Sequence, residues 1–278
     1  MNVSTTVRRR RVLVFDSGLG GLTVFARIAE ARPDLELVYA ADDAFFPYGA
    51  LGETALVERV GAVMDDLIAR TAPDVVVIAC NTASTLVLPP LRAAYPRLPF
   101  VGTVPAIKPA ALASKTRLIS VLATPGTVAR DYTRALVRDF AGDCKVALVG
   151  APRLAGFAER HLRGEAVDDA EIAREIAPCF VERGGRRTDH VVLACTHFPL
   201  LADHLRRLAP WPVAFVDPAP AIARRVDALI GRRAAPQGER GLSLAVFTSG
   251  RTPPPALRKA LRDRGLAVTS AEERAPTP

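Results

Sequence analysis

The chain of 278 residues is long enough for about two domains, and its 49% apolar and 24% charged residues are typical of a globular protein. This composition excludes a disordered chain, and four cysteines without close spacing exclude a disulfide scaffold and a CxxC zinc site. No apolar run approaches the roughly 18 residues that span a membrane, and the basic cluster at residues 8–11 leads into a strand, not into a signal peptide. We therefore expect a cytoplasmic protein with no membrane partner.

The net charge of +8 raises the question of a nucleic-acid partner. Of the 37 basic residues, 33 are Arg and four are Lys, and many Arg stand beside Asp or Glu on expected helices, as in residues 181–187. That distribution is typical of solvated helix faces in an Arg-rich chain. We therefore expect no nucleic-acid partner.

Short β-branched runs alternate with longer segments of helical spacing along the chain. The expected strands cover residues 12–15, 35–40, 75–79, 100–102, 118–122, 145–149, 191–194, 213–216 and 242–248. The expected helices between them include residues 20–31, 54–70, 127–140, 170–183 and 199–208. The strands are nearly continuous apolar runs, so both faces should be covered, and the alternation predicts mostly parallel α/β sheets.

An internal repeat predicts two similar domains. Val75-Val-Val-Ile-Ala-Cys-Asn-Thr82 recurs as His190-Val-Val-Leu-Ala-Cys-Thr-His197, and the openings at residues 12–21 and 118–127 match more loosely. We expect two parallel-sheet α/β domains that face each other across a cleft and are related by a pseudo-two-fold axis. The first should comprise residues 1–104 plus 217–278, with a frayed tail at 270–278, and the second residues 105–216.

Polar motifs follow the strands, at the edge of an open α/β sheet where ligands bind. They are Asp16-Ser17, Pro47-Tyr48-Gly49, Cys80-Asn81-Thr82, Thr124 and Cys195-Thr196-His197. If the domains face each other, these motifs converge on one cleft, and the two cysteines enter it from opposite sides.

Two opposed thiols suit the inversion of a carbon centre without a cofactor. One thiolate removes a proton from one face of the carbon, and the other thiol delivers a proton to the opposite face. A cysteine just before a helix N-terminus gains from backbone N–H groups and the helix dipole, so we expect a lowered pKa for these thiols. Asn81, Thr82 and Thr196 are expected to hold a substrate α-carboxylate, while Asp16 assists one cysteine and His197 the other.

We expect no catalytic role for the other cysteines and histidines. Cys144 and Cys179 lie in no polar constellation, so we expect packing residues. His161 and His204 are expected on exposed helical stretches, and His190 precedes a strand with no identifiable partner.

Neither a cofactor nor a metal ion is expected. Cys195 and His197 have no third ligand, and only Lys108 lies near a motif, which disfavours pyridoxal phosphate. Gly18-Leu-Gly-Gly21 lacks the GxGxxG pattern and a Walker lysine. An amino-acid carboxylate or amine, or tight strand–helix packing, explains these glycines better.

Five motifs together resemble the glutamate racemase family in order and approximate spacing. They are Val14-Phe-Asp-Ser-Gly-Leu-Gly-Gly-Leu-Thr23, Phe46-Pro-Tyr-Gly49, Ala79-Cys-Asn-Thr-Ala-Ser84, Thr124-Pro-Gly-Thr127 and Ala194-Cys-Thr-His-Phe-Pro-Leu-Leu201. The resemblance implies a cofactor-independent isomerase that interconverts L- and D-glutamate and supplies D-glutamate for peptidoglycan and the cell wall. It also implies that the first cysteine, Cys80, faces D-glutamate and that the second, Cys195, faces L-glutamate.

The resemblance assigns roles residue by residue. It implies that Cys80 and Cys195 are the acid/base pair, helped by Asp16, His197 and a glutamate of the second domain, for which Glu159 is the best match. The amino acid would be bound by Asp16, Ser17, Pro47, Tyr48, Gly49, Asn81, Thr82, Thr124, Thr127, Thr196 and His197. The segment Ala41-Asp-Asp-Ala-Phe-Phe46 departs from the Gly-Asp-Thr that often precedes Pro-Tyr-Gly in the family, and residues 232–240 have no obvious counterpart.

Two alternatives stay open from the sequence. One is an aspartate or other amino-acid racemase with the same two thiols, which the side-chain pocket would decide. The other, from a different class, is a basic regulatory protein that binds nucleic acid or a DNA-handling enzyme. The sequence leaves the oligomeric state open, with a homodimer among the options.

Overall fold

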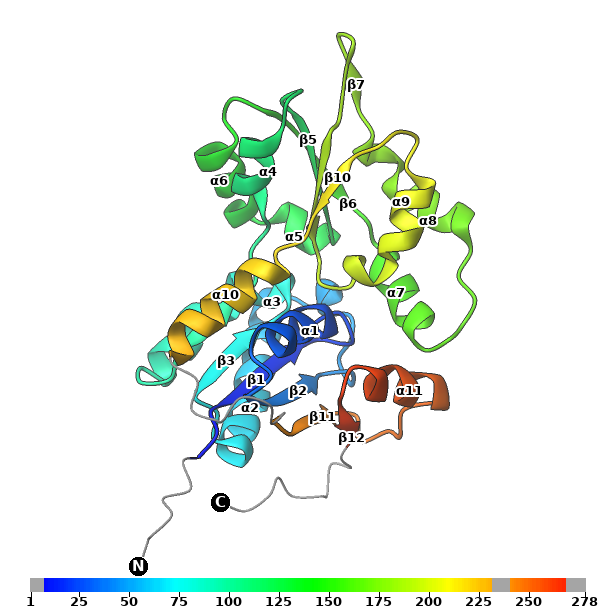
Figure 1. The fold of residues 1–278 in the computed structure, drawn as a ribbon. Helices are drawn as coiled ribbons and strands as arrows, with labels where there is room; N and C mark the ends of the chain where they lie inside the picture. Colours follow the sequence, from blue (N-terminus) through cyan, green and yellow to red (C-terminus); the bar gives the residue numbers. More distant parts are fainter. Residues whose placement is uncertain (1–7, 232–240, 269–278) are drawn as a thin grey trace, which may run out of the picture.

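The computed structural model describes residues 8–231 and 241–268, whose strands form two parallel sheets and a short separate hairpin (Figure 1). The first sheet has the order β12-β11-β2-β1-β3-β4 and the second β10-β9-β5-β6. The first-sheet strands are β1 Arg11–Asp16, β2 Glu36–Ala41, β3 Val75–Ile78, β4 Phe100–Gly102, β11 Ser243–Phe247 and β12 Ala267–Val268. The second-sheet strands are β5 Leu118–Ala123, β6 Lys145–Gly150, β9 His190–Ala194 and β10 Ala214–Val216.

The internal repeat is visible in the strand order. The run β2-β1-β3-β4 of the first sheet corresponds to β6-β5-β9-β10 of the second, and the repeated Ala-Cys segments follow β3 and β9. Each copy thus places its first strand between its second and third. Two similar parallel α/β units, as the sequence predicts, are confirmed.

Helices cover both faces of each sheet. On the first sheet, α1 Leu22–Ala31, α10 Ala219–Ile230 and α11 Pro255–Asp263 pack on one face, and α2 Glu53–Thr71 and α3 Asn81–Ala94 on the other. On the second, α7 Leu154–Leu162, α8 Asp169–Ile176 and α9 Ala202–Leu208 oppose α4 Ile107–Ala113 and α6 Asp131–Phe140. Burial on both faces explains why β3 is apolar at every position.

The helix expected at residues 170–183 is wrong beyond Ile176. There α8 ends, and the 3-10 turn η2 Ala177–Cys179 leads into the antiparallel strands β7 Glu182–Arg183 and β8 Arg186–Arg187. Pro178 has no N–H for a helix, and Gly184 and Gly185 take φ angles of +57° and +72°, which suit a two-residue hairpin turn. The arginines of this segment therefore lie on an exposed hairpin.

Two further expected helices are interrupted. The segment 127–140 consists of α5 Pro125–Ala129 and α6, separated by Arg130, whose backbone is extended. The segment 199–208 begins as the 3-10 turn η3 Phe198–Leu201 before α9. In both places the chain leaves a strand end and turns before it enters a regular helix.

The domain boundaries at residues 104/105 and 216/217 stay a prediction. They fall between β4 of the first sheet and α4, and between β10 of the second sheet and α10. The expected tail at 270–278 and the segment 232–240 lie outside the described residues. Within the described ranges, no helix has the length and apolar character needed to cross a bilayer.

Candidate active site

The carboxyl ends of the two sheets meet, and the polar motifs lie where they meet. Thr196, after β9, directs its hydroxyl to Asp16 at the end of β1, with Oγ1 to Oδ1 at 3.5 Å. Thr82, in the first turn of α3, lies 3.2 Å from Thr124 Oγ1 after β5. The structure therefore brings residues of both repeats into one cluster.

Cys80 is the N-cap residue of α3, directly after β3, and is 6% exposed. Its Sγ lies 3.8 Å from Ser17 Oγ. Burial, followed by the negative charge of Asp16, raises the pKa of Cys80, and a backbone hydrogen bond from Ala83 lowers it by less. The expectation of a lowered pKa for Cys80 is therefore wrong, because desolvation of the thiolate outweighs the helix N-terminus.

Cys195 enters the same cluster from the second sheet and is 7% exposed. Its Sγ lies 3.9 Å from His197 Nδ1, and His197 Nε2 lies 2.9 Å from Glu159 Oε1. Glu159, on α7, also accepts the backbone N–H of Leu19 from the first domain at 2.6 Å. A continuous chain of polar contacts thus links the second thiol to a buried carboxylate.

The charges of this chain are strongly coupled. Burial lowers the pKa of His197, but its hydrogen bonds with Cys195 and Glu159 and the charge of Asp16 outweigh burial and raise the pKa well above 6.5. Burial raises the pKa of Glu159, but its interactions with His197 and the Leu19 N–H lower it overall. These acidic neighbours therefore favour the protonated, imidazolium form of His197.

Asp16 is fully buried at the end of β1. Its Oδ2 accepts the Gly21 N–H at 2.8 Å. Burial raises its pKa, which the charge of His197 only partly offsets. Asp16 and Cys80 are thus two acids that share one dry region, so ionisation of one opposes ionisation of the other.

Three threonine hydroxyls and an unpartnered amide line the same region. Thr82 Oγ1 lies 3.2 Å from the hydroxyls of both Thr124 and Thr127, and Thr124 also caps α5. Asn81 is 2% exposed, and neither its Nδ2 nor its Oδ1 has a hydrogen-bond partner within the described chain. A buried amide without partners is costly, which points to a polar ligand as its natural partner.

The segment with Pro47, Tyr48 and Gly49 lies beside the threonine hydroxyls. The Tyr48 hydroxyl donates to Asp42 at 2.5 Å. A Cβ on Gly49 would lie 3.6 Å from the Thr124 side chain. The segment therefore offers its backbone, not the phenol, to the region between the domains.

The glycines after β1 make room for the second domain. A Cβ on Gly18 would collide with the Glu159 carboxylate and lie 2.9 Å from Phe46, and one on Gly20 would collide with the His197 ring. Both positions pack against residues of the second domain. The glycine-rich run was visible in the sequence, but the second-domain residues that it packs against, Glu159 and His197, could not be inferred from it.

Sequence reasoning missed three residues that support the site. Phe46 packs its ring on His197 with centroids 5.2 Å apart. Leu19 supplies the N–H for Glu159, and Asp42 holds Tyr48. Leu19 and Phe46 stand inside motifs of the family resemblance but carried no assigned role, and Asp42 is a carboxylate at the end of a buried strand.

The cysteines and histidines outside the cluster have structural surroundings. Cys179 is fully buried in the second core, and Cys144 is half-buried. His161 is exposed, as expected, but His204 is only half-buried, and its Nδ1 donates to the Asp169 carboxylate at 2.7 Å. His190, for which the sequence offered no partner, lies 2.9 Å from Asp189. No group of three or more metal-ligating side chains occurs in the described part of the chain.

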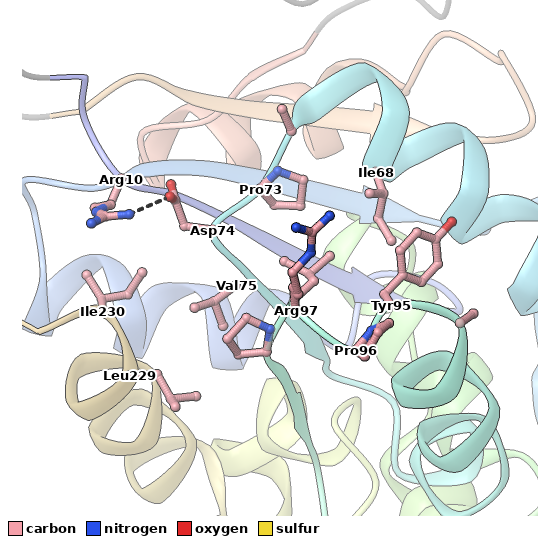
Figure 2. A pocket seen from close by; sticks show the side chains of 14 residues that line it. Arg10, Ile68, Pro73, Asp74, Val75, Tyr95, Pro96, Arg97, Leu229 and Ile230 are labelled. Carbon is pink, nitrogen blue, oxygen red and sulfur yellow. Dashed lines mark hydrogen bonds and ion pairs between the residues drawn. The ribbon is translucent and has the colours of Figure 1, made fainter.

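Two open cavities of the molecule lie away from the cysteines. One cavity of about 720 Å³ lies at the amino-terminal ends of the first-sheet strands, where Arg10, Asp74, Tyr95 and Arg97 surround it (Figure 2). Another cavity, of about 430 Å³, lies beside the segments that connect the two sheets, and Val104, Phe140 and Arg224 are among its lining residues. The cysteine cluster itself is buried.

Comparisons with known proteins agree with this geometry. The sequence profile of a family described as Asp/Glu/Hydantoin racemase matches residues 17–226. Glutamate racemase of Brucella anthropi is 57% identical over 92% of each chain, and that of Brucella ovis is 53% identical over 94% of this chain and 95% of its own. The crystal structure of Escherichia coli glutamate racemase, in complex with L-glutamate and the activator UDP-MurNAc-ala, superposes with a TM-score of 0.84 at 38% identity, covering 94% and 97% of the chains.

The chain therefore belongs to the Asp/Glu/Hydantoin racemase family, a family of isomerases. Within it, the chain groups with the glutamate racemases.

Proposed function

We propose that this chain interconverts L- and D-glutamate without a cofactor, with Cys80 and Cys195 as the two acid/base residues. The main supporting observation is that both thiols, one from each sheet, lie in the same buried cluster as the unpartnered Asn81 amide. The E. coli relative binds L-glutamate in its crystal structure.

The reaction needs one proton removed and one delivered on opposite faces of Cα. In the direction from L-glutamate, the Cys195 thiolate takes the Cα proton, and the bond's electron pair stays on the carbon and its carboxylate. The Cys80 thiol then gives its proton to the other face and becomes the thiolate. The reverse direction exchanges the roles, so no group is consumed.

The neighbouring charges support these proton transfers. The imidazolium of His197 lies 3.9 Å from Cys195 Sγ and favours negative charge on that sulfur, while Glu159 holds the imidazole ring. The negative charge of Asp16 raises the pKa of Cys80 and so keeps that residue in the thiol form that delivers a proton, and on this ground Asp16 is the proposed helper of Cys80. The Cys80 thiol also forms a hydrogen bond of 3.8 Å with Ser17 Oγ.

The polar groups divide between the two ends of the substrate. Asn81, Thr82 and Thr196 hold the α-carboxylate and stabilise the charge that spreads onto it as the Cα proton leaves. Thr124 and Thr127 extend this hydroxyl cluster through Thr82.

The other end of the substrate is its side-chain carboxylate. Ser17, Pro47, Tyr48 and Gly49 receive this group, with Tyr48 and Gly49 acting through the backbone because the Tyr48 hydroxyl is engaged. A shorter pocket here would favour aspartate, which is the runner-up substrate.

The product D-glutamate serves peptidoglycan synthesis, and thereby the cell wall and cell shape, in the cytoplasm. The alternative of a basic regulatory protein that binds nucleic acid or a DNA-handling enzyme has no observation in its favour beyond the net charge of +8.

Incubation of the pure protein with L-glutamate or L-aspartate in D2O, without added cofactor, tests the proposal. Loss of optical activity with incorporation of deuterium at Cα is expected for glutamate. Racemisation of aspartate alone would reject glutamate as substrate, and a requirement for pyridoxal phosphate would reject the two-thiol mechanism.

A further inference from the structure

Asp42 is a fully buried carboxylate at the carboxyl end of β2 that the proposed chemistry does not use. Four hydrogen bonds reach it from three elements. Arg59 of α2 donates through Nε at 2.9 Å and Nη2 at 2.5 Å, and the hydroxyls of Tyr48 and Thr248 donate at 2.5 Å each. Thr248 follows β11, so the C-terminal part of the chain takes part in this network.

The network ties down one end of the segment that crosses towards the second domain. Arg59 also stacks on Phe45, with its guanidinium carbon 4.1 Å from the ring centroid. Next along the chain, Asp43 accepts the backbone N–H of Ser249 at 2.9 Å and its hydroxyl at 2.6 Å. Residues 42–45 are thus fixed to α2 and to the chain after β11.

The other end of the same segment contacts the second domain. Phe46 packs on His197, and Gly49 faces Thr124. Since the fixed and the crossing parts are only a few residues apart, the position of residues 46–49 depends on the anchor at Asp42. Burial raises the pKa of Asp42, but Arg59, Thr248 and Tyr48 lower it overall, so the anchor is a carboxylate.

We propose that Asp42, together with Arg59 and Thr248, positions residues 46–49 for the substrate and thereby sets the room for its side chain. The inference rests on the proposed function, because it assigns the side-chain carboxylate to this segment. Asp42 touches neither cysteine through any hydrogen bond of the described residues, so it acts through Tyr48 and the backbone. It is a positioning residue that selects glutamate over shorter acids.

A second buried carboxylate offers a matched control. Asp34 binds Arg32 through two hydrogen bonds of 2.9 Å each, and both side chains are almost fully buried. Asp34 precedes β2 and therefore lies at the opposite edge of the same sheet from Asp42. Asp42→Asn and Asp34→Asn each remove one charge from an Arg–carboxylate pair, but only the first loosens the crossing segment.

The experiment measures KM and kcat for L-glutamate, D-glutamate and L-aspartate, together with thermal midpoints, in five proteins. These are the wild type, Asp42→Asn, Asp34→Asn, Thr248→Val and Thr248→Ser. For Asp42→Asn we expect KM for both glutamate enantiomers to rise roughly tenfold, the effect of weakening one charged hydrogen bond, with kcat within about threefold of wild type. The preference for glutamate over aspartate should fall in parallel.

The two Thr248 variants separate anchoring from stability. Thr248→Val loses the hydroxyl and should shift KM and substrate preference in the same direction by less, whereas Thr248→Ser keeps the hydroxyl and should restore both. Asp34→Asn should lower the thermal midpoint and leave KM unchanged. If Asp42→Asn does not fold, the Val and Ser pair decides.

Three outcomes overturn the inference. Unchanged KM and preference in Thr248→Val would show that the anchor has no effect on binding. An equal rise of KM in Asp34→Asn would show a general effect of lost stability, and a loss of kcat alone would place Asp42 in the chemistry. Failure of the proposed function is separate, because it would appear as wild-type protein that does not racemise glutamate.

Discussion

Gly20 leaves no room for a side chain beside His197. An alanine Cβ would lie 2.6 Å from the backbone nitrogen of His197 and closer still to Nδ1 of its ring. The φ angle of Gly20 lies outside the left-handed region, so the conflict of Gly20→Ala is purely steric. Non-bonded C and N atoms need about 3.5 Å, so the two domains would have to separate here by about 0.9 Å.

This displacement falls on the polar chain that serves Cys195. His197 would move relative to both Cys195 and Glu159, and a misplacement of about 1 Å costs on the order of 100-fold in rate, or about 2.7 kcal/mol of activation free energy. We therefore expect Gly20→Ala to reduce kcat with either glutamate enantiomer about 100-fold. Polarimetry or circular dichroism at fixed enzyme concentration measures the rate.

Two other glycines provide controls, because alanine at these positions should preserve activity and raise stability. Gly61 in α2 and Gly156 in α7 both lie inside helices, and a Cβ added to either would have nothing within 4 Å among the described residues. Their alanine variants should keep full activity and gain about 0.5–1 kcal/mol in the free energy of unfolding. Activity of Gly20→Ala within twofold of wild type would refute the close interdomain contact and the role assigned to it.

Three further predictions concern the thiols and His197. Cys80→Ala and Cys195→Ala should each keep the circular dichroism of the wild type and lose turnover by several orders of magnitude, and full activity in either variant would contradict a two-base mechanism. Cys80→Ser should enlarge the primary isotope effect with 2-deuterated D-glutamate, and Cys195→Ser with 2-deuterated L-glutamate; equal effects in both directions for both variants would indicate a single shared base. Because the folded state raises the pKa of His197, its stabilisation is complete below the unfolded pKa of about 6.5 and is lost as the pH rises through the folded value. Urea unfolding between pH 6.5 and 8 should therefore show a free energy that falls by up to roughly 1.4 kcal/mol per pH unit, and His197→Asn should lack that slope; parallel profiles would mean that His197 is neutral in the folded state.

The strands could be predicted because burial on both faces leaves a local signal. A parallel strand covered by helices, such as Val75–Ile78, must be apolar at each position. Each expected strand corresponds to a strand of one of the two sheets. The hairpin at residues 182–187 was missed although Pro178 and Gly184-Gly185 mark it, because its alternating charges resemble a helix surface. The two-residue strand β12 buries too little to leave a pattern.

Part of the site could likewise be predicted from local sequence motifs, whereas other parts depend on contacts between residues far apart in the chain. The motifs after β1, β3 and β9 could be placed together because parallel strands end at one edge and the sequence repeats. The contact of Glu159 with the Leu19 N–H joins residues far apart in the chain and depends on how the two domains close. No local pattern encodes that closure.

The pKa of Cys80 is the clearest consequence of that closure. Its place before a helix predicts a lowered pKa, but the closed cleft removes water from the thiol and puts Asp16 beside it, and both effects raise the pKa. Burial raises the pKa of Asp16 as well, and the charge of His197 offsets part of that rise, so the two acids compete for one negative charge. The raised pKa keeps Cys80 in its thiol form, which is the state that the proposed mechanism requires in the direction from L-glutamate. In the proposed mechanism, removal of a proton by Cys80 in the opposite direction then needs the Asp16 carboxylate to accept the thiol proton first, which is the role that we propose for Asp16 beside this buried thiol.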